Sequence, residues 1–100
     1  MKIKFEESSP RKVMSAIKKN IEGRKIADML EFELSDSAMT IQVSQMGTSS
    51  LEFSFKAKDG GLLFELSKEK IAFTHKPFMG EMREKLVKII KDSGGVVLEA

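Results

Sequence analysis

Five alternating runs of apolar and polar residues, followed by one amphipathic helix pattern, constrain the fold of this chain more than any other feature. Between Leu30 and Phe73 apolar residues recur at every second position, and short polar segments separate the runs. From Met79 to Asp92 the apolar period changes to that of a helix. A sheet that is apolar on one face only must bury that face under other elements. We therefore expect an antiparallel sheet with one solvent-exposed face.

The expected strands are short, and each contributes a row of apolar side chains to the buried face. The rows are Leu30, Phe32 and Leu34; Met39, Ile41 and Val43; Leu51, Phe53 and Phe55; Leu62, Phe64 and Leu66; and Ile71 with Phe73. The outer positions between them are polar, with Leu63 as the exception. Asp59-Gly60 predicts a tight hairpin, because both residues tolerate positive φ. Residues 67–70 are predicted to form a polar turn.

Two helices are expected, one before residues 30–73 in the sequence and one after them. Ser9 and Pro10 are typical of the N-cap and first position of a helix, and Gly23 is a plausible C-cap. The apolar stripe of this helix is Val13, Ile17 and Ile21. The stripe of the second helix is Met79, Met82, Leu86 and Ile89 or Ile90, and Gly94-Gly95 ends it. Ile3 and Phe5 indicate a first strand, and Val96 to Leu98 could add an edge strand.

These patterns predict a single α+β domain over residues 1–100. The expected order is β-α-β-β-β-β-β-α, with a curved antiparallel sheet and both helices on its apolar face, like a miniature helix-grip fold. A doubly wound parallel fold is excluded, because its strands would be apolar on both sides. We expect Phe53, Phe64 and Leu86 in the core, where the strand and helix stripes converge.

Composition excludes several kinds of chemistry. The chain has no cysteine, which excludes disulfides, thiolate catalysis, zinc fingers and iron–sulfur sites. The N-terminal residues alternate charged with apolar side chains, so no signal peptide is visible, and no run approaches the length of a membrane span. We therefore expect a cytoplasmic protein, and no sequence motif indicates a cofactor.

The candidates for catalysis are few. His75 is the only histidine, and no second histidine or cysteine is present to complete a usual transition-metal site. The glycine pairs lack the spacing of a phosphate-binding loop, and no serine lies in a nucleophile elbow. Glu31 and Glu33 lie on the same face of one expected strand, and paired carboxylates can act as acid and base. We expect this face to be exposed to solvent, so the pair is not expected to be catalytic. We predict that His75 is an accessible loop histidine, that it has no catalytic role, and that the protein is not an enzyme.

The strongest electrostatic feature is the basic face of the first helix. Residues 1–27 carry eight basic and three acidic side chains, whereas residues 28–67 carry two basic and seven acidic ones. Arg11, Lys12, Lys18 and Lys19 lie on the polar side of the expected helix and could bind an acidic partner. No aromatic residue lies among them, which argues against nucleic acid.

Apolar residues provide two further candidate surfaces. An exposed patch containing Leu63, Phe78 or Met79 would favour binding to a protein or an apolar surface, including a second copy of the chain. The side chains that would line an apolar ligand site between the sheet and the second helix are Phe53, Phe55, Phe64, Phe73, Met82 and Leu86. Seven methionines indicate an adaptable interior. A chain of this length is expected to leave little room for a large cavity.

The stretch from Met39 to Ile90 resembles the small polyhydroxyalkanoate-system proteins, which are encoded near storage-granule genes in bacteria. The residues that carry the resemblance are Ser44 and Gly47, then Pro77-Phe78-Met79-Gly80, then Glu81, Leu86 and Ile90. The resemblance implies a cytoplasmic accessory protein that acts at granule surfaces, and it implies no catalytic residues.

Two functions follow as hypotheses. The first is a non-enzymatic accessory protein that binds another protein or an apolar surface. The alternative is a helix-grip-type domain that binds an apolar small molecule between the sheet and the C-terminal helix. A pocket that converges on His75 would instead point to an enzyme.

Overall fold

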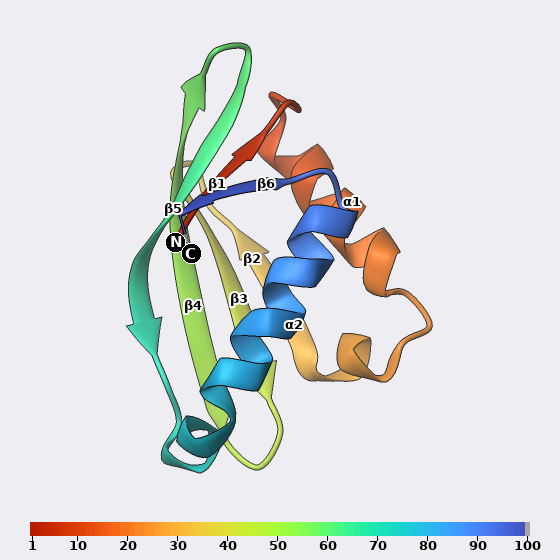
Figure 1. Cartoon of the computed structure of the whole chain (residues 1–100), viewed down its shortest axis with the longest axis vertical. Helices are drawn as coiled ribbons and strands as arrows, with labels where there is room; N and C mark the ends of the chain where they lie inside the picture. Colours follow the sequence, from red (N-terminus) through yellow and green to blue (C-terminus); the bar gives the residue numbers. More distant parts are fainter. Residues whose placement is uncertain (100) are drawn as a thin grey trace.

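The computed structural model describes residues 1–99 and shows one antiparallel sheet with two α-helices on the same face (Figure 1). The order of the strands across the sheet is β2-β3-β4-β5-β1-β6. Their bounds are β1 Lys2–Phe5, β2 Leu30–Leu34, β3 Ala38–Ser44, β4 Thr48–Lys58, β5 Gly61–Lys70 and β6 Val96–Glu99. The α+β class and the one-faced antiparallel sheet are therefore confirmed.

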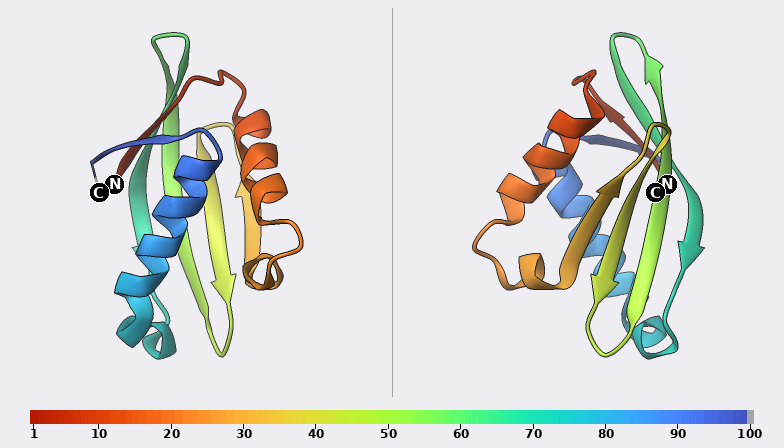
Figure 2. Two further views of the ribbon diagram at one scale, coloured as in Figure 1. Left: turned by 45° about the vertical axis from the view of Figure 1, so that its right-hand side comes forward. Right: turned by 180° about the vertical axis from the view of Figure 1, so that it is seen from behind.

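The helical segments are α1 (Pro10–Ile21), α2 (Met79–Asp92) and the short 3₁₀ helices η1 (Lys25–Met29) and η2 (Phe73–Phe78). Both views in Figure 2 show α1 and α2 on one side of the sheet. The Ser9 hydroxyl accepts a hydrogen bond from the Lys12 amide at the start of α1, and Pro10 occupies the first turn. Gly23 and Gly94 follow the two helices with positive φ, as their predicted roles at the helix ends require.

The core lies between this face of the sheet and the two helices. Val13, Ile17 and Ile21 of α1 and Leu86, Ile89 and Ile90 of α2 are buried against the inner rows of the strands. Phe64 lies at the centre, with its ring centroid 5.6 Å from that of Phe5 and 5.4 Å from that of Phe55. The predicted burial of Phe53, Phe64 and Leu86 is confirmed.

The sheet has six strands, as predicted, but the last strand in the sequence follows α2 instead of preceding it. No strand contains Ile71 and Phe73. Instead β5 continues through residues 67–70, which were predicted to be a turn, and Phe73 begins η2. The strand after α2, which the sequence only suggested, pairs with β1 at the edge of the sheet. The observed order is therefore β-α-β-β-β-β-α-β.

A β-bulge explains why the end of β5 does not look like a strand in the sequence. The register between β4 and β5 shifts so that Phe53 pairs with Leu66, whereas Glu52 pairs with Lys68. The extra residue, Ser67, donates its hydroxyl to the backbone oxygen of Glu52 at 3.0 Å. An extra residue reverses the alternation, so the helix side of the sheet receives Glu69, which forms an ion pair with Arg83 of α2.

Leu63 is buried, although it was considered for an exposed apolar patch. Its side chain belongs to the outer face of the sheet, yet only 8% of the residue is exposed. The register places it between Lys4 of β1 and Lys56 of β4. Long lysine side chains cover apolar surface with their methylene groups while their amines stay in water. Leu63 is therefore not part of an exposed patch.

Candidate binding groove between the sheet and the C-terminal helix

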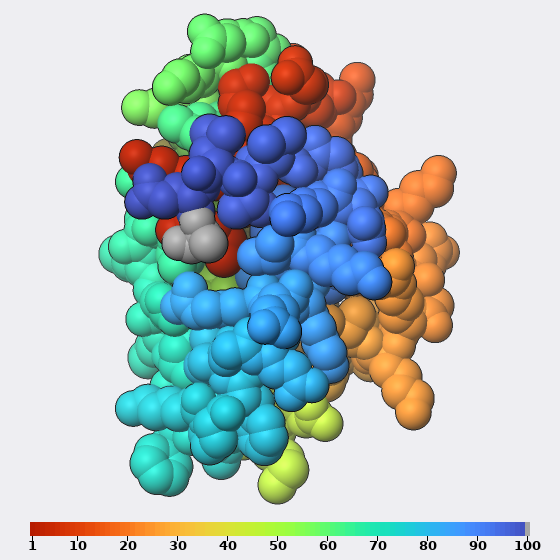
Figure 3. All heavy atoms as spheres, viewed as in Figure 1, coloured from red at the N-terminus to blue at the C-terminus, as the bar shows by residue number. Residues whose placement is uncertain are grey.

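An open groove of about 550 Å³ lies between α2, η1 and the sheet. Figure 3 shows α2 crossing this face of the molecule, with the segment that contains η1 beside it. The volume falls within the usual range of small-molecule sites, about 300–1,000 Å³. The expectation that a chain of this length has little room for a large cavity is not contradicted, because the space is an open groove rather than an enclosed hole in the core. We call it the α2 groove.

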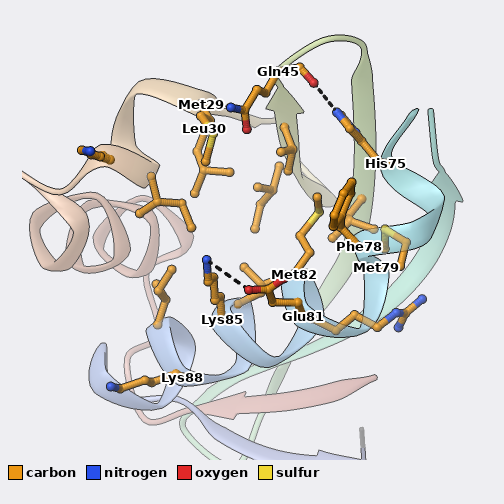
Figure 4. Close-up of a pocket in the computed structure, with 18 of the residues that line it drawn as sticks. Met29, Leu30, Gln45, His75, Phe78, Met79, Glu81, Met82, Lys85 and Lys88 are labelled. Atoms are coloured by element: carbon orange, nitrogen blue, oxygen red, sulfur yellow. Dashed lines mark hydrogen bonds and ion pairs between the residues drawn. The ribbon is translucent and has the colours of Figure 1, made fainter. Parts of the chain in front are cut away.

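Apolar side chains from six elements form the floor and the walls of the α2 groove. The strands supply the floor with Leu30, Ile41, Val43 and Leu51, η1 supplies Ile26 and Met29, and η2 and α2 supply Phe78, Met79, Met82, Leu86 and Ile89. In Figure 4, Met29 and Leu30 lie across the groove from Met82 and Phe78. Methionine side chains on both walls allow the groove to adapt to the shape of an apolar ligand.

The turn between β3 and β4 is fastened to η2 by four hydrogen bonds, and we call this cluster the turn clasp. Ser49 accepts a hydrogen bond from the Ala72 amide at 2.9 Å, and Thr74 donates its hydroxyl to the Met46 carbonyl at 2.6 Å. His75 contacts the Ser49 hydroxyl through Nδ1 at 2.5 Å and the Gln45 carbonyl through Nε2 at 2.6 Å. The clasp therefore fixes the chain just before α2 and with it the end wall of the groove.

His75 is buried, so the prediction of an accessible loop histidine is wrong. Only 6% of the residue is exposed. A carbonyl oxygen can only accept, so Nε2 must carry a proton and donate it to the Gln45 carbonyl. In the neutral ring Nδ1 then accepts the proton of the Ser49 hydroxyl. The neutral imidazole satisfies both of its nitrogen atoms in this way.

The contact between Ser49 and His75 brings together two residue types that can form a nucleophile and its base. A nucleophile must reach its substrate, however, and only 1% of Ser49 is exposed. Its hydroxyl already accepts from one group and contacts the imidazole, and the second nitrogen of His75 is bound to a backbone carbonyl. His75 also lines one end of the α2 groove, as an enzyme would require. Its two bonds nevertheless suit a structural fastening rather than proton transfer.

Gly47 allows the turn clasp to close. Its φ is +131°, and a Cβ atom at this position would lie 2.7 Å from the Thr74 hydroxyl oxygen and 3.2 Å from the Ala72 Cβ. Such distances are shorter than van der Waals contact, so any larger residue would push η2 away from the turn. The preceding residue, Met46, also has a positive φ, of 54°.

The structure separates the predicted apolar-ligand residues into two groups. Met82 and Leu86 line the α2 groove as predicted. Phe53 and Phe64 are buried in the core, Phe55 packs against it, and Phe73 is 84% exposed, so none of these four lines the groove. Phe73 lies outside because the chain leaves the sheet at the end of β5 and turns into η2.

The predicted partner-binding residues are also dispersed. Arg11, Lys12, Lys18 and Lys19 are exposed on α1, away from the α2 groove, and the amine of Lys18 lies 5.9 Å from the centre of the Phe32 ring. Phe78 and Met79 are at the end of the groove near the turn clasp. The proposed interaction of the basic face with an acidic partner stays a prediction.

Several residues of the α2 groove were not predicted from the sequence. The pattern of the sequence assigns no regular element to the segment from Arg24 to Met29, which forms one wall of the groove with Ile26 and Met29. Their spacing of three residues was the available signal. The basic residues Lys85 and Lys88 were not predicted, because nothing in a linear pattern shows that they border a groove.

Three of the most exposed large apolar side chains occur at the end of the molecule that carries the turn clasp. They are Met46, Phe73 and Phe78, which are 86%, 84% and 59% exposed. The turn between β3 and β4 and the η2 segment lie together at the lower end of the view in Figure 1. We call these three residues the apolar tip.

Comparisons of the chain with protein-family models, with curated proteins and with solved structures found no match. The resemblance to polyhydroxyalkanoate-system proteins thus stays a prediction. Among residues 1–99, no helix is both long and apolar enough to cross a membrane. The same residues contain no group of three or more histidine, aspartate or glutamate side chains placed to hold a metal ion.

Proposed function

We propose that this protein is a non-enzymatic binding protein that holds the apolar part of a small molecule in the α2 groove. The observation that carries the proposal is the groove itself, with its apolar floor on three strands and its methionine-rich walls. Sites for small molecules are typically concave, largely apolar and bordered by a few polar groups. The groove has all three properties, and it lies where a helix-grip domain would hold a ligand.

An environment-sensitive neutral dye tests this proposal directly. Nile red is excited and emits at visible wavelengths, where protein side chains do not absorb, so its fluorescence reports binding in the parent protein and in tryptophan variants alike. We expect saturable binding of one dye per chain. The variant Met82→Trp should fill the groove and weaken binding at least tenfold, while the far-ultraviolet circular dichroism stays unchanged.

Met46→Trp is the matched control, because Met46 is highly exposed and does not line the groove. This variant should bind the dye as the parent protein does. Absence of saturable binding to the parent protein would overturn the proposal, and so would equal binding by Met82→Trp.

The apolar tip supports a second candidate, an accessory protein that docks on the apolar surface of a storage granule. Lys76 is the only charged residue in the two tip segments 45–48 and 71–80 when His75 is neutral, although about a third of the chain is charged. Transfer of one phenylalanine from water to an apolar phase contributes about 1.5–3 kcal/mol. Two phenylalanines and a methionine on adjacent loops are therefore a favourable anchor.

Flotation with particles of amorphous polyhydroxybutyrate tests the second candidate, and triglyceride droplets show whether any apolar surface suffices. The variant Met46→Ser/Phe73→Ser should lose most of the flotation. Val96→Ser/Leu98→Ser removes two other exposed apolar side chains, from β6, and should keep it. Failure of the parent protein to float, or the same loss in both variants, would refute docking through the tip.

A further inference from the structure

The charged residues around the α2 groove are strongly unbalanced. Five basic residues line it, namely Arg24, Lys25, Arg83, Lys85 and Lys88, against the single acidic residue Glu81. The whole chain has 17 basic and 15 acidic side chains, so the imbalance is local. The outer face of the sheet differs, because it carries charges of both signs, with Glu31, Glu33, Glu52 and Glu65 beside Lys2, Lys4, Lys56 and Lys68.

Two of the five basic residues have counterions within the chain. Arg83 is paired with Glu69 of β5, and Lys85 lies 3.9 Å from Glu81 one helical turn earlier. For Arg24, Lys25 and Lys88 the structure shows no ion pair within residues 1–99. The groove therefore carries three cations without a counterion.

These three cations come from opposite walls. Arg24 and Lys25 lie at the start of η1, whereas Lys88 projects from α2, where Figure 4 shows it together with Lys85 and Glu81. Like charges that line one groove repel each other, and an anion bound among them reduces that repulsion.

We propose that the ligand of the α2 groove is an anionic amphiphile, an unbranched acyl chain with a carboxylate or similar head group. The chain would lie on Ile41, Val43 and Leu51, and the head group would be bound by Lys25 and Lys88, with Arg24 nearby. This inference rests on the proposed binding function and adds the charge of the ligand to it. Positive potential on this face would also raise the rate of association with anions.

Three ligands with the same chain length and different head groups provide the test. Dodecanoate, dodecanol and dodecyltrimethylammonium, each below the concentration at which it aggregates, are titrated against bound Nile red. We expect dodecanoate to bind about tenfold more tightly than dodecanol, because several exposed ion pairs each contribute modestly. The cation should bind most weakly, and the advantage of dodecanoate should shrink as salt increases.

Charge reversal on the two walls supplies the decisive comparison. Lys25→Glu/Lys88→Glu should remove the preference for dodecanoate but leave dodecanol binding within about twofold. Lys12→Glu/Lys56→Glu changes the net charge equally, at positions that do not line the groove, and should retain most of the preference. The control therefore separates a local effect from the net charge of the protein.

The outcomes distinguish the two proposals. Equal affinity for all three ligands would overturn the anionic head group but leave the apolar groove in place. Loss of the preference in both double variants alike would overturn local recognition by Lys25 and Lys88. If none of the three ligands displaces Nile red, and Nile red itself does not bind, the proposed function fails as well.

Discussion

Replacement of His75 by alanine measures how much the turn clasp stabilises the fold. The imidazole makes two hydrogen bonds, one with the Ser49 hydroxyl and one with the Gln45 carbonyl. Gln45 is exposed, so water can replace the imidazole at its carbonyl, and that bond contributes about 0.5–1.5 kcal/mol. Ser49 is fully buried, and loss of its partner leaves a polar group unsatisfied at a cost of about 1–3 kcal/mol. The expected decrease in the free energy of unfolding is therefore about 1.5–4.5 kcal/mol.

Urea denaturation followed by far-ultraviolet circular dichroism gives this free energy, provided that the slope of the transition is unchanged. Thr74→Val is the control, because it removes an exposed hydrogen bond of the same clasp and should cost no more than about 1 kcal/mol. The double variant Ser49→Ala/His75→Ala should cost less than the sum of the two single variants, since the buried partner is removed together with the imidazole. A cost for His75→Ala below about 0.5 kcal/mol, typical of surface sites, would refute the structural role of the clasp.

Four other substitutions test the core, a close backbone approach, an open position in α2 and the outer face. Phe64→Ala should lower the free energy of unfolding by about 3–5 kcal/mol in urea titrations, and an unchanged midpoint would contradict its central place in the core. Gly61→Ala should cost about 1–3 kcal/mol, because the new Cβ would lie 2.0 Å from the Phe5 carbonyl oxygen. Gly80→Ala, in α2 with open space around it, should instead stabilise by about 0.4–1 kcal/mol in thermal melts. Leu63→Ala should cost about 2 kcal/mol, whereas an exposed leucine would show almost no effect.

Much of the fold could be predicted because local residue choices agree with the long-range arrangement. The alternation from Leu30 to Leu66 placed four strands correctly, and Asp59 and Gly60 indeed adopt positive φ, of 51° and 80°, in the predicted hairpin. The end of β5 could not be predicted, because the bulge at Ser67 reverses the alternation. A strand segment with polar side chains on both faces looks like a turn in the sequence, because the sequence does not show that Glu69 pairs with Arg83 of α2.

The groove was less predictable than the fold, since its parts come from distant segments. His75 stands between Thr74 and Lys76, and its two partners lie 26 and 30 residues earlier in the chain. No pattern in one sequence shows that such a polar residue will be buried. Met82 and Leu86 could be predicted because they belong to the regular stripe of α2. Lys25 and Lys88 could not, because an exposed lysine has the same appearance whether it borders a groove or open solvent.

The anchoring of α2 at both of its ends has a consequence for how the α2 groove adjusts to a ligand. The turn clasp holds the chain before α2, while the Asn20 amide donates to the Ile89 carbonyl at 3.1 Å and β6 ties the following residues to β1. α2 is therefore held at both of its ends. η1, by contrast, has no buried residue and no side-chain hydrogen bond at its N-cap. If the α2 groove binds a ligand as proposed, we therefore expect η1, rather than α2, to be the wall that adjusts to the ligand.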